Sequence, residues 1–186
     1  MDDTGHVMTQ EWKLGTPRIV LVVMSNAAPL TQWTNTRQIK SFQKGLISAT
    51  NTTEMWILTN GINIGVSKII GDAVQEEMQR RNSKRHFQKH HLASSDPNSR
   101  IVLVGVARDD LLNHGDAFDG KTQRIEIENE GNKIEEQKFD LNPDHSHFLI
   151  VKDGTISKTG INYFLLRLQQ YLATTLEHPR KSATTY

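Results

Sequence analysis

Residues 55–74 constrain the fold of this chain more than any other segment. A short apolar run ends at Thr59, an Asn60-Gly61 turn follows, and apolar residues then recur at helical spacing from Asn63 onward. The pattern predicts a strand, a glycine turn and a helix. Backbone N–H groups and the helix dipole attract an anion at such a helix start, so a nucleotide phosphate is the first ligand to consider. An ordinary strand-to-helix connection would show the same pattern.

Composition is typical of a soluble protein and excludes several kinds of site. The chain has 186 residues and a net charge of +1, so it can build one domain with a core but has no overall field that attracts nucleic acid. It has no cysteine, which excludes disulfides, thiolate nucleophiles and sulfur-based zinc sites. The longest apolar run, residues 19–24, is far shorter than the roughly 20 residues that span a bilayer. We therefore expect neither a nucleic-acid partner nor a membrane span in this chain.

Strands and helices are predicted to alternate. Continuous apolar runs, typical of buried strands in a parallel sheet, fall at residues 19–24, 55–59, 101–106 and 147–151. Helical spacing of apolar residues predicts helices at 35–50, 63–81 and 161–176. This alternation predicts a Rossmann-like three-layer α/β/α fold with a mostly parallel sheet.

Other segments are expected to lie outside this framework. Residues 1–16 are interpreted as a polar tail and residues 177–186 as a loose tail. Residues 124–128 are typical of a half-exposed strand, and residues 133–139 could pair with it as a hairpin. Residues 80–98 are interpreted as a basic insertion, with residues 84–98 as a loop. Its cations are Arg80, Arg81, Lys84, Arg85 and Lys89, beside His86, His90 and His91. They could bind a phosphoinositide or nucleic acid, but a solvated surface explains them better.

Two blocks of sequence carry a family resemblance. The first runs from Trp56 to Val74, and the second, more specific block begins with His145-Ser-His-Phe, continues through Asp153-Gly154-Thr155 and ends at Gly160. Over residues 17–176 the chain resembles the N-terminal cytosolic region of TRPM cation channels, which is a SLOG domain. The resemblance implies the first part of a larger SLOG domain, because the sheet of the family continues beyond the last helix predicted here.

The resemblance also implies a role. The family's region belongs to a tetrameric membrane channel that conducts calcium or monovalent cations, and it lies on the cytosolic side. In some members its cleft binds an ADP-ribose-type nucleotide that helps to open the pore. The expected partners are therefore other channel segments or subunits, together with such a nucleotide. No other cofactor and no catalysis are implied.

Ten residues are candidates for binding a phosphate or nucleotide. They follow the first, second and fourth predicted strands or lie on the last helix: Ser25, Asn26, Thr59, Asn60, Gly61, Asn63, Asp153, Gly154, Thr155 and Arg167. Asn63 could instead be a helix N-cap, and the Asp153-Gly154-Thr155 segment could be an ordinary turn.

The turns after the first two strands differ from those of the family. Ala27-Ala28 and Pro29 follow the first strand where the family tends to have two glycines, which restricts the backbone and removes a donor. The second turn has Asn60 in place of a glycine, a milder change because asparagine tolerates a left-handed backbone.

The last helix also lacks two ligand contacts of the nucleotide-binding members. Their tyrosine and arginine correspond to Thr159 and Leu166 here, and Arg167 points about 100° away from position 166. Losing a stacking partner and a charged phosphate contact would each cost about 1–3 kcal/mol. We therefore expect weak or absent nucleotide binding.

Metal binding and catalysis are the remaining possibilities. His145 and His147 would share a face of one strand, but only Asp140 and Asp144 lie near them in the sequence. Hydrogen bonding that holds the loop before this strand explains them better. The chain has none of the common hydrolase motifs, nor the Pro-Gly-Gly-x-Gly-Thr-x-x-Glu loop of related nucleotide hydrolases. A stand-alone, truncated SLOG-type protein that binds or hydrolyses a nucleotide is the second hypothesis.

Overall fold

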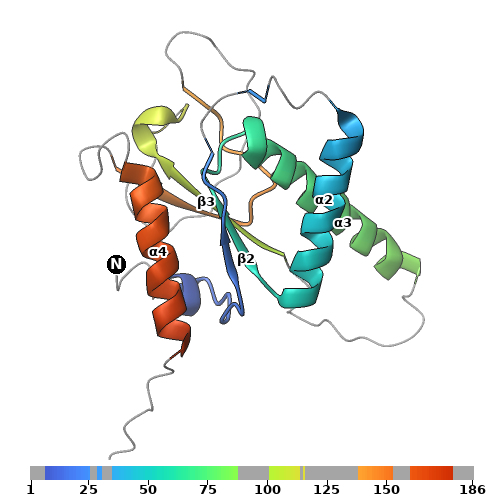
Figure 1. Cartoon of the computed structure of the whole chain (residues 1–186), viewed down its shortest axis with the longest axis horizontal. Helices are drawn as coiled ribbons and strands as arrows, with labels where there is room; N and C mark the ends of the chain where they lie inside the picture. The colour runs from blue at the N-terminus through green and yellow to red at the C-terminus, as the bar shows by residue number, and fades with distance from the viewer. Residues whose placement is uncertain are drawn as a thin grey trace, which may run out of the picture.

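A four-stranded parallel sheet with helices on both faces forms the centre of the computed structural model (Figure 1). The structure describes residues 7–25, 29–30, 35–87, 101–113, 115, 138–152 and 160–177. The strands lie side by side in chain order as β1 (Val20–Val22), β2 (Trp56–Thr59), β3 (Val102–Arg108) and β4 (His147–Val151). Each strand is parallel to its neighbour. The predicted Rossmann-like α/β fold class is therefore confirmed.

One face of the sheet is covered by α2 (Thr36–Thr53) and α3 (Gly65–Phe87). Their core includes Leu46 and Ile70, which pack with Ile57 and Leu103 from the central strands. The strands follow one another across the sheet in chain order, and connections between parallel strands are almost always right-handed. The helices that connect β1 to β2 and β2 to β3 therefore lie on the same face. The two helices are therefore neighbours, and they pack against each other.

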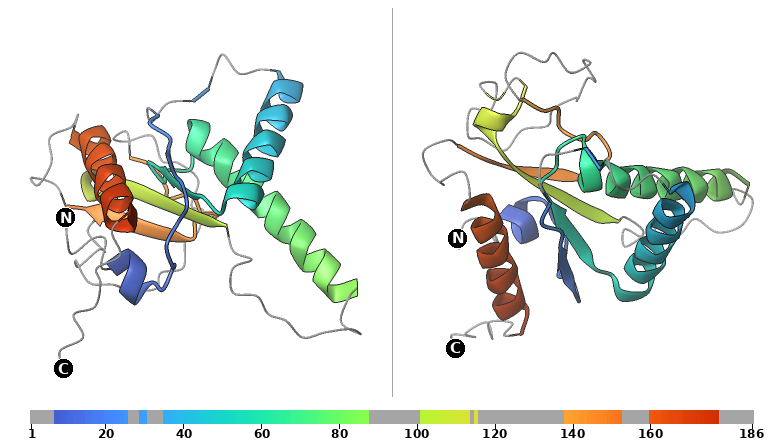
Figure 2. Two further views of the ribbon diagram at one scale, coloured as in Figure 1. Left: turned by 60° about the horizontal axis from the view of Figure 1, so that its bottom comes forward. Right: turned by 45° about the horizontal axis from the view of Figure 1, so that its top comes forward.

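The other face is covered by α4 (Gly160–Glu177) and by a short π-helical turn, η1 (Val7–Glu11) (Figure 2). Leu165 and Leu168 of α4 pack with Met8 and with alternate residues of β2 and β3. Alternate strand residues point to opposite faces, which explains why one apolar run supplies both cores. After β4 the chain therefore changes face, and α4 packs against both β3 and β1.

Helix α2 is defined by polar groups at both ends. Asn35 is its N-cap, and its side-chain oxygen accepts a hydrogen bond from the backbone N–H of Arg37 at 3.0 Å. Glu54 ends the helix in a left-handed conformation with φ of 52°. The predicted helix is confirmed, and it continues for about one turn beyond its predicted end. In this last turn the hydroxyls of Thr52 and Thr53 donate to the carbonyl oxygens of Ser48 and Ala49 in the same helix.

Two predictions for irregular segments are corrected by the structure. The sequence predicts a polar tail at residues 1–16, but η1 forms within them and Met8 is completely buried. It predicts a loop from residue 84, but α3 continues to Phe87. Arginine and lysine have good helix propensity, so an exposed helix end needs no apolar stripe to continue. The predicted strand at 124–128 and most of the hairpin segment 133–139 lie outside the described residues.

Candidate functional site at the turn between β2 and α3

The predicted phosphate-binding turn is held by its own side chains. Thr59 is completely buried, and its Oγ1 accepts a hydrogen bond from the backbone N–H of Gly61 at 2.9 Å. The side-chain oxygen of Asn60 accepts from the N–H of Ile62 at 3.3 Å. Gly61 has a φ of 70°, so the glycine and not Asn60 takes the left-handed conformation.

Asn60 links three elements of the fold. Its side-chain Nδ2 lies 3.2 Å from the backbone oxygen of Ser25 and 3.3 Å from the Ser25 hydroxyl oxygen, just beyond β1. Its side-chain oxygen also accepts a hydrogen bond from the Ser67 hydroxyl in the first turn of α3. Both ends of the Asn60 amide are therefore used by the protein at the position where the sequence predicts a phosphate.

Gly61 is required by packing as well as by the turn. A Cβ atom placed on Gly61 would lie 2.7 Å from the Cα atom of Gly105 in β3 and 3.2 Å from the Phe148 ring. Glycine allows the backbone of the turn to approach another group closely, and here that group is β3. In a nucleotide-binding turn the same close approach would be made to the ligand.

A segment before β4 covers the turn. The N–H of Asn142 donates to the carbonyl oxygen of Gly61 at 2.8 Å, and the N–H of Asn63 donates to the carbonyl oxygen of Asp140, also at 2.8 Å. Ile62 and Leu141 form an antiparallel bridge between these two bonds. The backbone donor of Asn63, which the phosphate hypothesis needs, is thus directed at another part of the chain.

His145 continues this network on the buried side. Its Nδ1 lies 3.2 Å from Asn142 Oδ1, which can only accept, so Nδ1 carries the proton. Its Nε2 lies 2.8 Å from Thr59 Oγ1 and accepts the threonine hydroxyl. Burial lowers the pKa of His145 to about 4, although a hydrogen bond to the Asn142 backbone partly offsets this. His145 is therefore a neutral structural residue at neutral pH, and its predicted role in holding the loop is confirmed.

Asn142 is a residue of this site that the sequence does not predict. It is completely buried, donates to Asn63 Oδ1 at 3.2 Å and accepts the N–H of Asp144 at 2.9 Å. A Cβ atom on Gly71 would lie 2.5 Å from its side-chain oxygen, so α3 can pack here only because residue 71 is glycine. An asparagine before a proline is common in turns, and nothing else in the sequence distinguishes it.

The structure brings only some of the ten candidates together. Ser25, Thr59, Asn60, Gly61 and Asn63 lie at the carboxyl ends of β1 and β2. Arg167 lies on α4, on the opposite face of the sheet from α3, and its guanidinium carbon is 6.0 Å from the centre of the Tyr163 ring. The other four candidates, Asn26, Asp153, Gly154 and Thr155, lie outside the described residues.

The two histidines are placed in different surroundings. His145 is buried beside Thr59, whereas His147 begins β4 and stacks on Trp12 with ring centres 4.7 Å apart. Within the described residues, no group of three or more histidine, aspartate or glutamate side chains is arranged to hold a metal ion.

The amino-acid sequence of the chain matches a known family. The family model described as "SLOG in TRPM" matches residues 1–185. The chain belongs to the TRPM-type SLOG family. This SLOG chain is 32% identical over 181 residues to the transient receptor potential cation channel subfamily M member 6 of Homo sapiens, which covers 97% of this chain. It is 27% identical to the transient receptor potential cation channel trpm of Drosophila melanogaster over 97% of this chain.

Subfamily M member 1 of Mus musculus is a further relative, 26% identical over 89% of this chain. These matches confirm the resemblance that the Trp56 and His145 blocks indicated. The SLOG chain spans only about 8% of the length of the human and Drosophila channels. No helix in the described part of the chain is both long and apolar enough to cross a membrane.

Proposed function

We propose that this SLOG chain is an assembly module on the cytosolic side of a TRPM-type cation channel, and that it pairs with other channel polypeptide through the edge of β1 that no described strand covers. The channel would be tetrameric and would conduct calcium or monovalent cations, as the family resemblance implies. A nucleotide of the ADP-ribose type would bind weakly or not at all at the turn after β2. The names of these relatives, which are cation channels, favour this role over a stand-alone hydrolase.

The observation that carries the proposal is the edge of β1. Among the described residues, β1 pairs with β2 only. Ile19 and Met24, which flank the strand, keep 48% and 52% of their surface exposed. An apolar strand edge with unpaired backbone groups is a template for another strand.

Backbone geometry identifies the groups that a partner would meet. The carbonyl oxygen of Ile19 and the N–H of Val23 bond to β2. Because the backbone N–H and carbonyl groups of successive residues point to opposite edges of a strand, those of Val20 and Val22 point to the edge of β1 away from β2. Helix α4 packs against both β3 and β1. A strand that came after α4 and was joined to β4 by a right-handed crossover would therefore lie beside β1, at its edge away from β2.

Substitution of Val22 tests this edge. Val22→Pro removes an outward N–H and leaves the ladder to β2 intact, whereas Val22→Ala removes a similar amount of side-chain packing and keeps the N–H. We expect co-purification with the full-length human member 6 channel to fall at least fivefold for the proline variant relative to the alanine variant. Equal recovery of both variants, with both folded by circular dichroism, would contradict the proposed edge.

The nucleotide part is tested by calorimetry with ADP-ribose. Asn60, Thr59 and the Asn63 N–H already have protein partners, which supports weak binding at most. We expect no measurable heat at millimolar ADP-ribose. Saturable binding that Asn60→Ala abolishes and Arg167→Ala preserves would show instead that the turn opens for a ligand. Release of ribose 5-phosphate from a nucleoside monophosphate would support the hydrolase hypothesis.

A further inference from the structure

Ser83 belongs to the basic segment of the sequence, which the proposed function does not explain. It follows Arg80 and Arg81, and it is the only serine or threonine of the chain with an arginine three positions before it. No aspartate or glutamate occurs from residue 78 to residue 95. Arginine-directed protein kinases select a serine by binding the arginines just before it with their own carboxylates. The sequence around Ser83 therefore has the charge pattern of such a substrate.

Ser83 lies near the end of α3, in a part of the helix that extends beyond the strands (Figure 2). In the described part of the chain, Met78 is the last residue of α3 that packs against an apolar cluster, whereas Asn82, Ser83 and Lys84 are exposed. The Ser83 hydroxyl donates to the carbonyl oxygen of Gln79 at 3.0 Å, one turn earlier in the same helix. A helix end with few tertiary contacts opens at little cost in free energy. Such opening is needed here because kinases bind the residues around the serine in an extended form.

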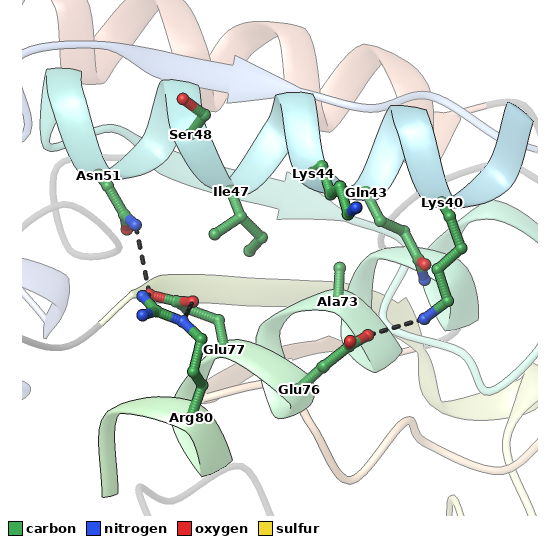
Figure 3. A pocket seen from close by; sticks show the side chains of 10 residues that line it. All are labelled: Lys40, Gln43, Lys44, Ile47, Ser48, Asn51, Ala73, Glu76, Glu77 and Arg80. Atoms are coloured by element: carbon green, nitrogen blue, oxygen red, sulfur yellow. Dashed lines mark hydrogen bonds and ion pairs between the residues drawn. The ribbon is translucent and has the colours of Figure 1, made fainter. Parts of the chain in front are cut away.

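Both arginines before Ser83 are held by one carboxylate, that of Glu77. Arg80 donates through Nε and Nη2 to the two carboxylate oxygens, each at 2.7 Å, and Arg81 Nε donates to Oε1 at 2.8 Å. Glu77 is buried and also accepts a hydrogen bond from the Asn51 amide of α2 at 3.3 Å. Figure 3 shows the Arg80 guanidinium beside the Glu77 carboxylate, next to Asn51. Glu77 thus binds the same groups that a kinase carboxylate would bind.

We propose that Ser83 is a phosphorylation site for an arginine-directed protein kinase, and that Glu77 restrains its modification by holding Arg80 and Arg81. The restraint is partial, because half of the Arg80 side chain is exposed and a competing carboxylate can reach it. The γ-phosphoryl group of ATP passes to Ser83 Oγ, ADP leaves, and the aspartate base of the kinase takes the hydroxyl proton. The product adds about two negative charges to a segment that otherwise has no acidic residue. The proposal rests on the cytosolic location proposed above, because ATP is available there.

The site is tested by transfer of labelled phosphate from ATP to the whole chain. The enzyme is the catalytic subunit of cAMP-dependent protein kinase, which selects serines that follow paired arginines. We expect label at Ser83, located by mass spectrometry, and no label in Ser83→Ala. Ser41→Ala is the matched control and should be labelled like the wild type, because Ser41 is also exposed on a helix but follows no arginine pair.

Rates of labelling test the roles of the charged neighbours. Arg81→Gln should lower kcat/KM by about tenfold, because a charge-assisted contact with the kinase is lost. Lys84→Gln removes a cation on the other side of Ser83 and should leave the rate unchanged. Glu77→Gln releases both arginines and should raise kcat/KM by about threefold or more. Glu76→Gln, which removes only the exposed pair with Lys40, should have no such effect.

Gly71→Ala controls for a general loosening of α3, because it crowds Asn142 and does not alter the arginines. Circular dichroism verifies that each variant is folded. A wild-type chain that stays unlabelled overturns the proposal, and so does label that persists in Ser83→Ala. Equal rates for Glu77→Gln and Gly71→Ala would refute the restraint by Glu77. The assay contains no channel polypeptide, so its failure leaves pairing through β1 standing, and failure of that pairing leaves the labelling unaffected.

Discussion

His145 and Thr59 are 86 positions apart in the sequence, yet His145 Nε2 lies 2.8 Å from Thr59 Oγ1. The same threonine oxygen accepts the N–H of Gly61, and the other ring nitrogen of His145 donates to Asn142. A continuous chain of hydrogen bonds thus runs from the turn after β2 to the loop before β4. Because His145 donates through Nδ1 and accepts through Nε2, the network requires a neutral histidine.

Stability should therefore fall as the pH decreases from about 6.5 towards 4. The pKa of His145 is lowered to about 4 when folded, so in this window the unfolded chain binds more protons than the folded chain. By pH 4 the free energy of unfolding should have fallen by on the order of 2–3 kcal/mol through this group. Urea denaturation at several pH values measures it. His145→Gln should remove that part of the pH dependence, whereas His147→Gln should retain it, and identical profiles for the two variants would contradict the assignment.

Gly61→Ala should destabilise the fold by about 2–4 kcal/mol. The residue has a φ of 70°, and the new methyl group would meet Gly105 Cα at 2.7 Å. Gly45→Ala is the matched control, because Gly45 is in α2 and a Cβ atom there would have nothing within 4 Å, so alanine should add about 0.5–1 kcal/mol. Chemical denaturation gives both values. A Gly61→Ala variant as stable as the wild type would show that the turn can relax.

Gly71 and Asn142 should be energetically coupled. A methyl group on Gly71 would lie 2.5 Å from Asn142 Oδ1, so Gly71→Ala should displace the asparagine and cost about 2–3 kcal/mol. In an Asn142→Ala background the methyl group has room, and the same change should cost at least about 1 kcal/mol less. A double-mutant cycle of unfolding free energies measures this difference. Additive effects would mean that the strain is relieved elsewhere.

Glu77 should contribute stability that is lost in acid. Its pKa is held at about 2 by Arg80, against an ordinary value of 4.5, so the contribution is complete above pH 4.5 and disappears as the pH falls towards 2. Glu77→Gln should cost about 1–2 kcal/mol at pH 7, since Arg80 is half exposed and partly screened by solvent. Glu76→Gln removes an exposed pair with Lys40 and should change little. The two variants are compared by thermal unfolding at pH 7 and pH 2.5.

The local elements of this fold follow from the sequence. The apolar runs at β2, β3 and β4 and the periodicity of α2 and α4 each depend on residues close together in the chain, and the predicted positions agree with the structure to within a few residues. Boundaries are less predictable where propensity alone decides, as in α3, which starts at Gly65 and continues through charged residues to Phe87. The family resemblance is also readable from short blocks.

Tertiary structure alone decided how the turn after β2 is used. The sequence determined a strand, a glycine turn and a helix, and it indicated a phosphate there because isolated turns of this kind expose backbone donors. Only the fold brings Asp140 and Asn142 onto Asn63 and Gly61, and Gly105 against Gly61. Hydrogen bonds and close contacts between segments distant in the chain leave no periodic pattern in either segment, so the occupied turn could be recognised only in three dimensions.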